Sequence, residues 1–275
     1  MDLTKKHLNF QCYGVKIGII TEKTEQLEKV KSQLEKIFPY GYEKLNDNEE
    51  IAFQFYIKTG NNNLIEFYHE EGKEFESIES DNFYDLVQSR IRLTIAEYAV
   101  GKVFLHAGVI GWKDRAIVIP ARSFSGKTTL VAEMVKMGAL YYSDEYAVLD
   151  ENGNVEPFPK WLSMRGIIDE RTQLDCSVES LGGIAGKTAL PVGMILIARY
   201  DQAKKTPRRW QPQRLSEGQG IMEVLPHTMP IRNKPKFVLE VLNKLARRAI
   251  IIKTVRGDAR EFAPLLLHFF EKQIA

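Results

Sequence analysis

The chain has 275 residues, 44% of them hydrophobic and 27% charged, a composition typical of a globular protein with one large or two ordinary domains. Its formal net charge of +2 gives no sign of a nucleic-acid partner. No apolar run approaches the roughly 18 residues of a membrane span, and the first ten residues lack the apolar core of a secretion signal. We therefore expect a cytoplasmic protein without a membrane partner. Cys12 and Cys176 stand far apart in the sequence, which predicts neither a disulfide nor a zinc site.

Residues 1–100 are expected to form a small α+β lead domain. Hydrophobic periodicity and turn residues predict its elements. They are a strand over 9–21, an amphipathic helix over 24–38, a hairpin of strands 51–58 and 64–68, and a long helix over 83–100. The polar stretch 70–81 is expected to be a connection, and no motif in this part indicates a role.

The pattern changes after Gly101, and residues 101–275 are expected to form an α/β domain. Short apolar runs predict strands over 103–110, 116–119, 141–142, 146–149, 155–158, 192–198 and 249–255. Helical spacing predicts helices after Lys127, over 216–225 and 236–248, and at the end of the chain. Capping boxes are expected at Ser216 with Gln219 and at Asp258 with Glu261.

Two stretches end in Gly-Lys-Thr, the close of a phosphate-binding loop. Neither has the first glycine of the full pattern, because Ala121 and Leu181 stand there. The stretch 121–130 follows a buried-strand pattern and leads into helical spacing. The stretch 181–190 follows a polar segment, and Pro191 soon begins another strand. A phosphate loop needs a strand before it and a helix start after it. The first stretch is therefore predicted to bind phosphate, and the second to be a glycine loop between strands.

The first loop predicts a nucleotide site. Its binding residues are expected to be Ala121, Arg122, Ser123, Phe124, Ser125, Gly126, Lys127, Thr128 and Thr129. Lys127 would supply the cation for the β- and γ-phosphates, and Thr128 a magnesium ligand. Asp144 and Glu145 follow a short apolar run, where one acid can hold metal while its neighbour faces an acceptor. The alternative is a pair of solvated turn acids.

His106 lies between Leu105 and Ala107 in an otherwise apolar strand. A histidine in such a place is commonly a core residue with satisfied nitrogens, and a catalytic histidine is the alternative.

Three segments together carry a resemblance to a known family. They are 105–109 with His106, 117–128 with the first loop, and 138–145 with the two acids. In order and spacing they resemble the catalytic domain of bacterial HPr kinase/phosphorylase and its stand-alone relatives, which is related to phosphoenolpyruvate carboxykinase. The segment 162–169 is similar to a later stretch of that family. The resemblance covers about residues 103–169 and implies an α/β, HPr kinase-like P-loop domain with a mixed sheet over 101–275.

The resemblance also implies roles for single residues. Lys127 and Thr128 match the phosphate lysine and the metal-binding hydroxyl residue, and His106 matches a histidine near the transferred phosphate. Asp144 matches the acid that activates the acceptor, and Glu145 is placed near the metal. Arg165 matches an arginine able to stabilise charge in transfer. The chain departs from the family at Ser163, where an acid is expected, and it lacks the arginine-rich region used for dephosphorylation.

These observations predict an ATP- and Mg²⁺-dependent kinase that phosphorylates a hydroxyl, with a Ser of a protein or peptide as the expected acceptor. A kinase of a small hydroxylated metabolite and a non-catalytic nucleotide sensor are the alternatives. The basic segment 201–214 is either a solvated loop or a flap over the site, and Lys160 and Trp161 are candidates to line the same cleft. The sequence leaves a homo-oligomer open.

Overall fold

The computed structural model describes residues 6–38, 41–70, 72–121, 125–165, 173–204 and 210–274. The side chains of 63, 163–165 and 173–175 also lie outside the description. The chain divides into two compact units, Met1–Val100 and Gly101–Ala275. Each unit has its own sheet. Among the described residues, no helix is both long and apolar enough to cross a membrane.

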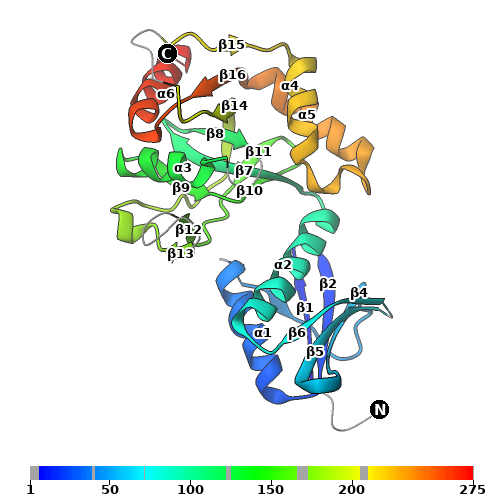
Figure 1. Ribbon diagram of the computed structural model, residues 1–275. Helices are drawn as coiled ribbons and strands as arrows, with labels where there is room; N and C mark the ends of the chain where they lie inside the picture. The colour runs from blue at the N-terminus through cyan, green and yellow to red at the C-terminus, as the bar shows by residue number, and fades with distance from the viewer. Residues whose placement is uncertain are drawn as a thin grey trace. The chain divides into compact units, whose positions relative to one another are not determined.

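The first unit is a six-stranded sheet with two helices. Its elements are β1 (Lys6–Cys12), β2 (Val15–Thr21), α1 (Thr24–Ile37), β3 (Glu43–Lys44), β4 (Phe53–Thr59), β5 (Leu64–His69), β6 (Gly72–Ile78) and α2 (Asp81–Tyr98). The strands lie in the order β3-β1-β2-β4-β5-β6. α1 and α2 lie together against the sheet (Figure 1). Alternate strand residues such as Phe10, Ile17 and Phe55 are fully buried and form the core of this unit.

Two expectations for this unit are wrong. Residues 9–21 lie in two strands rather than one, because Tyr13 and Gly14, with φ of 48° and 76°, turn the chain between β1 and β2. The polar stretch 70–81 contains the edge strand β6. Its Lys73, Glu74 and Glu76 are exposed, as is common on sheet edges, so no apolar run marks it.

The second unit is built on an eight-stranded sheet. Its strands are β7 (Val103–Trp112), β8 (Arg115–Pro120), β9 (Leu140–Ser143), β10 (Tyr146–Leu149), β11 (Asn154–Glu156), β14 (Leu190–Tyr200), β15 (Gln213–Arg214) and β16 (Ile250–Arg256). The order is β11-β10-β7-β8-β14-β16-β15, and β9 also pairs with β7. β8, β14 and β16 run parallel to one another, and the other described pairs are antiparallel. The sheet is therefore mixed. β12 (Leu162–Arg165) and β13 (Gln173–Cys176) form a separate hairpin that the sequence did not predict.

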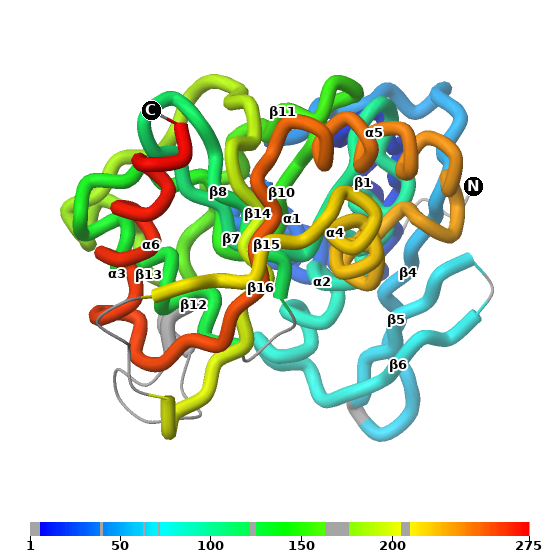
Figure 2. Tube along the Cα trace, turned by 90° about the horizontal axis from the view of Figure 1, so that it is seen from above, coloured from blue at the N-terminus to red at the C-terminus, as the bar shows by residue number. Residues whose placement is uncertain are grey.

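Helices cover both faces of this sheet (Figures 1 and 2). α3 (Lys127–Lys136) and α6 (Ala259–Ile274) pack on one face, where they share a core with Ile117 and Ile119 of β8. α4 (Glu217–Val224) and α5 (Pro235–Arg248) pack on the other, over Ala116 and Val118. After the exposed Arg115, β8 is buried on both faces and is therefore apolar rather than alternating.

The elements expected around the two Gly-Lys-Thr stretches are confirmed. Helix α3 follows the first stretch, and strand β14 follows the second. The capping box of Ser216 and Gln219 begins α4 as predicted. The expected strand 155–158 is shorter, since β11 ends at Glu156. At the start of α6, Asp258 Oδ1 accepts a bond from the Arg260 backbone N–H, not from the Glu261 N–H that the predicted box requires.

Candidate functional site

The carboxyl end of β8 leads into α3 through the first Gly-Lys-Thr stretch. Gly126 precedes the helix with φ of 74°, a left-handed conformation that glycine adopts without strain. Within the described residues, no side chain caps this helix start, and its first turn has no acid. Its first N–H groups and the positive end of its dipole are thus available to an anion. Of the predicted loop, 122–124 lie outside the described residues.

Lys127 begins α3 and turns its side chain inward. It is only 7% exposed, and its Nζ has no hydrogen-bond partner in the described part of the chain. Its stem passes over Gly108 of β7, where a Cβ atom would lie 2.9 Å from Lys127 Cγ. Burial lowers the pKa of the ammonium to about 8, although Asp144 and Glu145 act in the opposite direction. A buried ammonium without a hydrogen-bond partner is costly, so this position favours an anionic ligand.

Asp144 lies beside the start of α3. Thr128 Oγ1 donates a hydrogen bond of 3.0 Å to Asp144 Oδ2. The single hydroxyl proton of Tyr141 is shared between Asp144 Oδ1, 3.0 Å away, and the carbonyl of Lys160, 2.8 Å away. The carboxylate is almost fully buried. Burial, followed by the charge of Asp144, raises the pKa of Tyr141 well above its usual range, so Tyr141 is a hydrogen-bond donor at neutral pH. The predicted magnesium ligand Thr128 therefore contacts Asp144.

Glu145 lies closer than Asp144 to the ammonium of Lys160. Lys160 Nζ lies 3.1 Å from Glu145 Oε2 and 4.0 Å from Asp144 Oδ1. The Glu145 side chain is 18% exposed, against 3% for Asp144. Ser143 Oγ accepts hydrogen bonds from the backbone N–H groups of Glu145 and Tyr146 and so fixes the turn that presents both acids. The two carboxylates thus sit side by side in unequal surroundings.

Backbone hydrogen bonds connect β7 to the start of the first Gly-Lys-Thr stretch and to the turn that carries the two acids. The N–H of Ala121 donates to the carbonyl of His106, and the N–H of Ala107 donates to the carbonyl of Glu145. His106 and Gly108 lie on the same face of the strand, and the stem of Lys127 crosses Gly108. His106 is half-buried, and its ring centroid lies 6.3 Å from that of Tyr146. The strand therefore brings His106, the start of the loop and the acids to one place.

The second Gly-Lys-Thr stretch is a packing loop. A Cβ on Gly183 would lie 2.2 Å from Val135 of α3, and one on Gly186 would lie 2.1 Å from the ring of Tyr142. Tyr142 Oη donates to the carbonyl of Thr188, while Lys187 is exposed. Close packing against α3 and β9 explains Gly183 and Gly186, and the left-handed φ of 72° explains Gly182.

Three further residues of the predicted site are Ser125, Thr129 and Arg165. Thr129 is exposed, whereas Ser125 Oγ is buried and has no hydrogen-bond partner among the described residues. Arg165 ends β12, but its side chain lies outside the description. Lys160, expected as a candidate to line the cleft, contacts both acids, and Tyr141, for which no role was expected, contacts Asp144. The sequence shows only how far these residues stand from Asp144 and Glu145 along the chain. A hydroxyl or an ammonium at such a separation belongs to no characteristic motif.

No family model matches the chain, and no curated protein does either. Among solved structures, it is similar to the Hpr(Ser) kinase/phosphatase from Coxiella burnetii. The identity is 12%, the match covers 62% of this chain and 95% of that chain, and the TM-score is 0.35. At that TM-score the likeness carries no argument, and the function has to be argued from the residues of the site.

Proposed function

We propose that this protein is an ATP- and magnesium-dependent phosphotransferase that transfers the γ-phosphoryl group to a hydroxyl. One observation carries the proposal. The buried ammonium of Lys127 lacks a hydrogen-bond partner among the described residues, and it stands at an uncapped helix start beside two carboxylates. A nucleotide's phosphates supply the missing acceptors, and the N–H groups of α3 bind them from the other side.

The contacts favour one division of roles between the acids. Thr128 and Asp144 share a hydrogen bond, as a loop hydroxyl and a strand-end acid do when both hold Mg²⁺ in phosphate-loop enzymes. When bound, the ion would neutralise charge on the β- and γ-phosphates. Tyr141 orients Asp144 from its other oxygen. This assignment reverses the one implied by the sequence resemblance, in which Asp144 activates the acceptor and Glu145 is near the metal.

Glu145 is then the carboxylate for the acceptor. It is the more exposed of the two acids, so an acceptor hydroxyl has better access to it. Its carboxylate would take the hydroxyl proton as the acceptor oxygen bonds to the γ-phosphorus and the bond to the bridging oxygen of ADP breaks. Lys160, 3.1 Å from Glu145, and Lys127 supply two cations for the charge that spreads over the γ-phosphate.

A Ser of a protein or peptide is the acceptor class that the sequence resemblance implies. A small hydroxylated metabolite is the alternative within the same chemistry, and a nucleotide sensor would bind ATP without transfer. ATP with a radiolabelled γ-phosphate, supplied with Ser-containing peptides and with small hydroxylated metabolites, separates the three: label on peptide, label on a small molecule, or no transfer.

The first test compares the two Gly-Lys-Thr lysines. Lys127→Ala should weaken ATP binding by about 10- to 100-fold, since a hydrogen bond to a charged group contributes about 1.5–3 kcal/mol. Lys187→Ala is the matched control, because Lys187 follows the same motif but is exposed. Calorimetric titration measures both. Equal loss in the two variants, or loss in Lys187→Ala alone, would rule out the first loop as the phosphate site.

The second test separates the acids. Asp144→Asn should raise the magnesium concentration needed for half-maximal transfer by about tenfold or more. Glu145→Gln should leave that requirement nearly unchanged and lower the transfer rate by roughly 100-fold, because an amide cannot accept the proton. Transfer rates across a magnesium titration give both quantities. The opposite pattern would restore the roles implied by the resemblance.

A further inference from the structure

A buried arginine lies directly behind the first Gly-Lys-Thr loop. Arg256 ends β16 and is 3% exposed. Its Nη2 donates 2.8 Å to the carbonyl of Gly126 and 3.4 Å to that of Ser125, and Nη1 donates 3.0 Å to that of Gly257. All these acceptors are backbone carbonyls. No carboxylate of the described residues lies within 4.0 Å of the guanidinium, so its charge is not neutralised by an ion pair.

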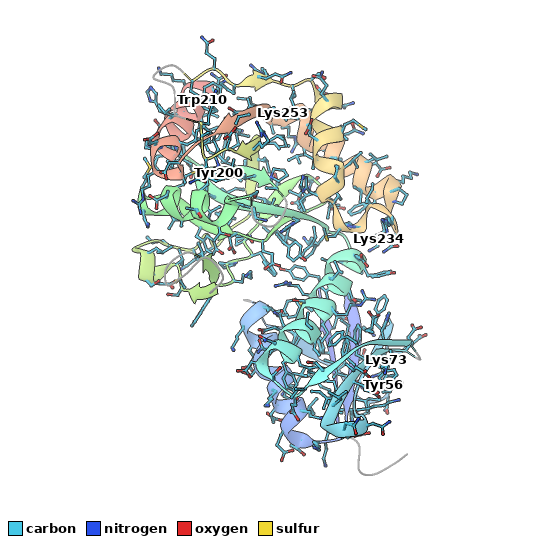
Figure 3. The ribbon with its side chains drawn as sticks, viewed as in Figure 1. Tyr56, Lys73, Tyr200, Trp210, Lys234 and Lys253 are labelled. Carbon is cyan, nitrogen blue, oxygen red and sulfur yellow. The ribbon has the colours of Figure 1, made fainter. Side chains whose placement is uncertain are left out.

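The position of Arg256 is closely fitted to the loop. A Cβ on Gly126 would lie 2.6 Å from Nη2, so the guanidinium occupies the space of a side chain there. Tyr200, the last residue of β14, pairs with Arg256 across the parallel strands. The guanidinium carbon lies 5.1 Å from the centroid of the Tyr200 ring, which is labelled in Figure 3. The ring therefore holds the guanidinium from the next strand.

The carbonyls of Ser125 and Gly126, two of the three that accept from Arg256, determine what the arginine does. Each belongs to a peptide group whose N–H is carried by the next residue, Gly126 or Lys127. A carbonyl that accepts from a cation polarises its own peptide group and makes that N–H a stronger donor. The Gly126 carbonyl also accepts the first helical bond of α3, from the Leu130 N–H. The arginine thus acts on both the loop and the helix start.

We propose that Arg256 is a positioning residue for phosphate binding. It fixes the loop with its carbonyls turned toward the guanidinium and strengthens the N–H groups of Gly126 and Lys127 as donors to the phosphates. The charge of Asp258 acts on the buried guanidinium without forming an ion pair with it, and a bound anion adds to that counter-charge. This inference rests on the proposed function, since it requires that the loop bind a nucleotide.

Three variants test it. Arg256→Met removes the charge, and Arg256→Lys keeps the charge but loses the planar fork that serves two carbonyls. Arg248→Met is the matched control, because Arg248 also donates to a backbone carbonyl, that of Asn152, but is exposed. Affinities for ATP and for inorganic pyrophosphate are measured by calorimetry below the melting temperature of each variant, together with kcat and KM for transfer.

Arg256→Met should bind both ATP and pyrophosphate about tenfold or more weakly, and Arg256→Lys should fall between it and the wild type. In the transfer assay, KM for ATP should rise more than kcat falls. If Arg256→Met does not fold, Arg256→Lys decides by the same readouts. Wild-type affinity in a folded variant, whatever its melting temperature, would show that the arginine only stabilises the fold. If the wild type binds neither ligand, the proposed function fails, and this inference fails with it.

Discussion

Lys127 carries a positive charge in a buried position. Its pKa falls from the ordinary 10.5 to about 8 because burial disfavours the charged form. Between these two values the unfolded chain binds a proton that the folded chain does not. The free energy of unfolding contributed by this group should therefore rise with pH from about 8 to about 10.5. Below pH 8 both states are protonated, and the full cost of burying the charge is present.

The prediction is measured against Lys127→Met, which has no titrating group at this position. Urea unfolding at pH 7.5 and 9.5, with a chelator and without nucleotide, should show the wild type gaining stability relative to Lys127→Met as the pH rises. Other lysines and the tyrosines titrate in both proteins and cancel in the difference. Lys187→Met is the control: it retains Lys127 and should gain stability relative to Lys127→Met as the wild type does. If the difference in the free energy of unfolding between the wild type and Lys127→Met stays constant or falls as the pH rises, the burial of the ammonium is contradicted.

At the scale of single residues, the sequence indicated Lys127, Asp144 and Glu145. It did not indicate that Lys160 contacts the two acids or that Arg256 contacts the loop. Lys127 and Asp144 belong to local patterns, a loop before a helix and an acid after a strand. Lys160 and Arg256 belong to none. They reach the site because β16 ends beside the loop and because Tyr141 Oη bonds the carbonyl of Lys160. Contacts of that kind depend on the tertiary fold, which a local pattern does not contain.

Strand β7 and helix α3 meet where a glycine leaves room. A Cβ on Gly108 would lie 2.8 Å from Val131 Cγ2 and 2.9 Å from Lys127 Cγ. Gly108→Ala should therefore displace the lysine stem, weakening ATP binding by about tenfold and lowering stability by roughly 1–3 kcal/mol through overpacking. Calorimetry and urea unfolding measure the two effects. Gly218→Ala in α4 is the control: its Cβ meets no atom within 4 Å, and it should bind ATP as the wild type does. Unchanged affinity in Gly108→Ala would show that the packing there does not position Lys127.

The elements that the sequence predicted well are those with strong periodicity or turn chemistry. Strands β7 and β8 are two of them, and the turn residues between them, Lys113 and Asp114, have φ of 50° and 59°. The long helices are others. The pairing of strands that are remote in sequence was not predictable. β14, for example, lies between β8 and β16, and no local pattern indicates these two neighbours. The edge strand β6 was missed since exposed charges replace the expected alternation.

On the scale of the whole molecule, the candidate site belongs to one unit. Its described side chains, from His106 to Arg256, all lie in Gly101–Ala275. That unit has its own cores on the two faces of its sheet, formed with α3 and α6 and with α4 and α5. A chain of that length buries enough apolar surface to fold as a domain.

A protein consisting of residues 101–275 should therefore fold and bind ATP within a few-fold of the full chain, and residues 1–100 should not bind it. At an ATP concentration 100 times the dissociation constant, binding should stabilise the fragment by about 2.7 kcal/mol, which corresponds to roughly 5–10 °C in melting temperature. The measurement is a thermal melt with and without ATP and magnesium. Lys127→Ala in the same fragment serves as the control, and at the same ATP concentration its 10- to 100-fold weaker binding should leave a stabilisation of only about 0.4–1.4 kcal/mol. A folded fragment whose melting temperature ATP does not raise, while the full chain responds, would show that the nucleotide site needs residues from 1–100.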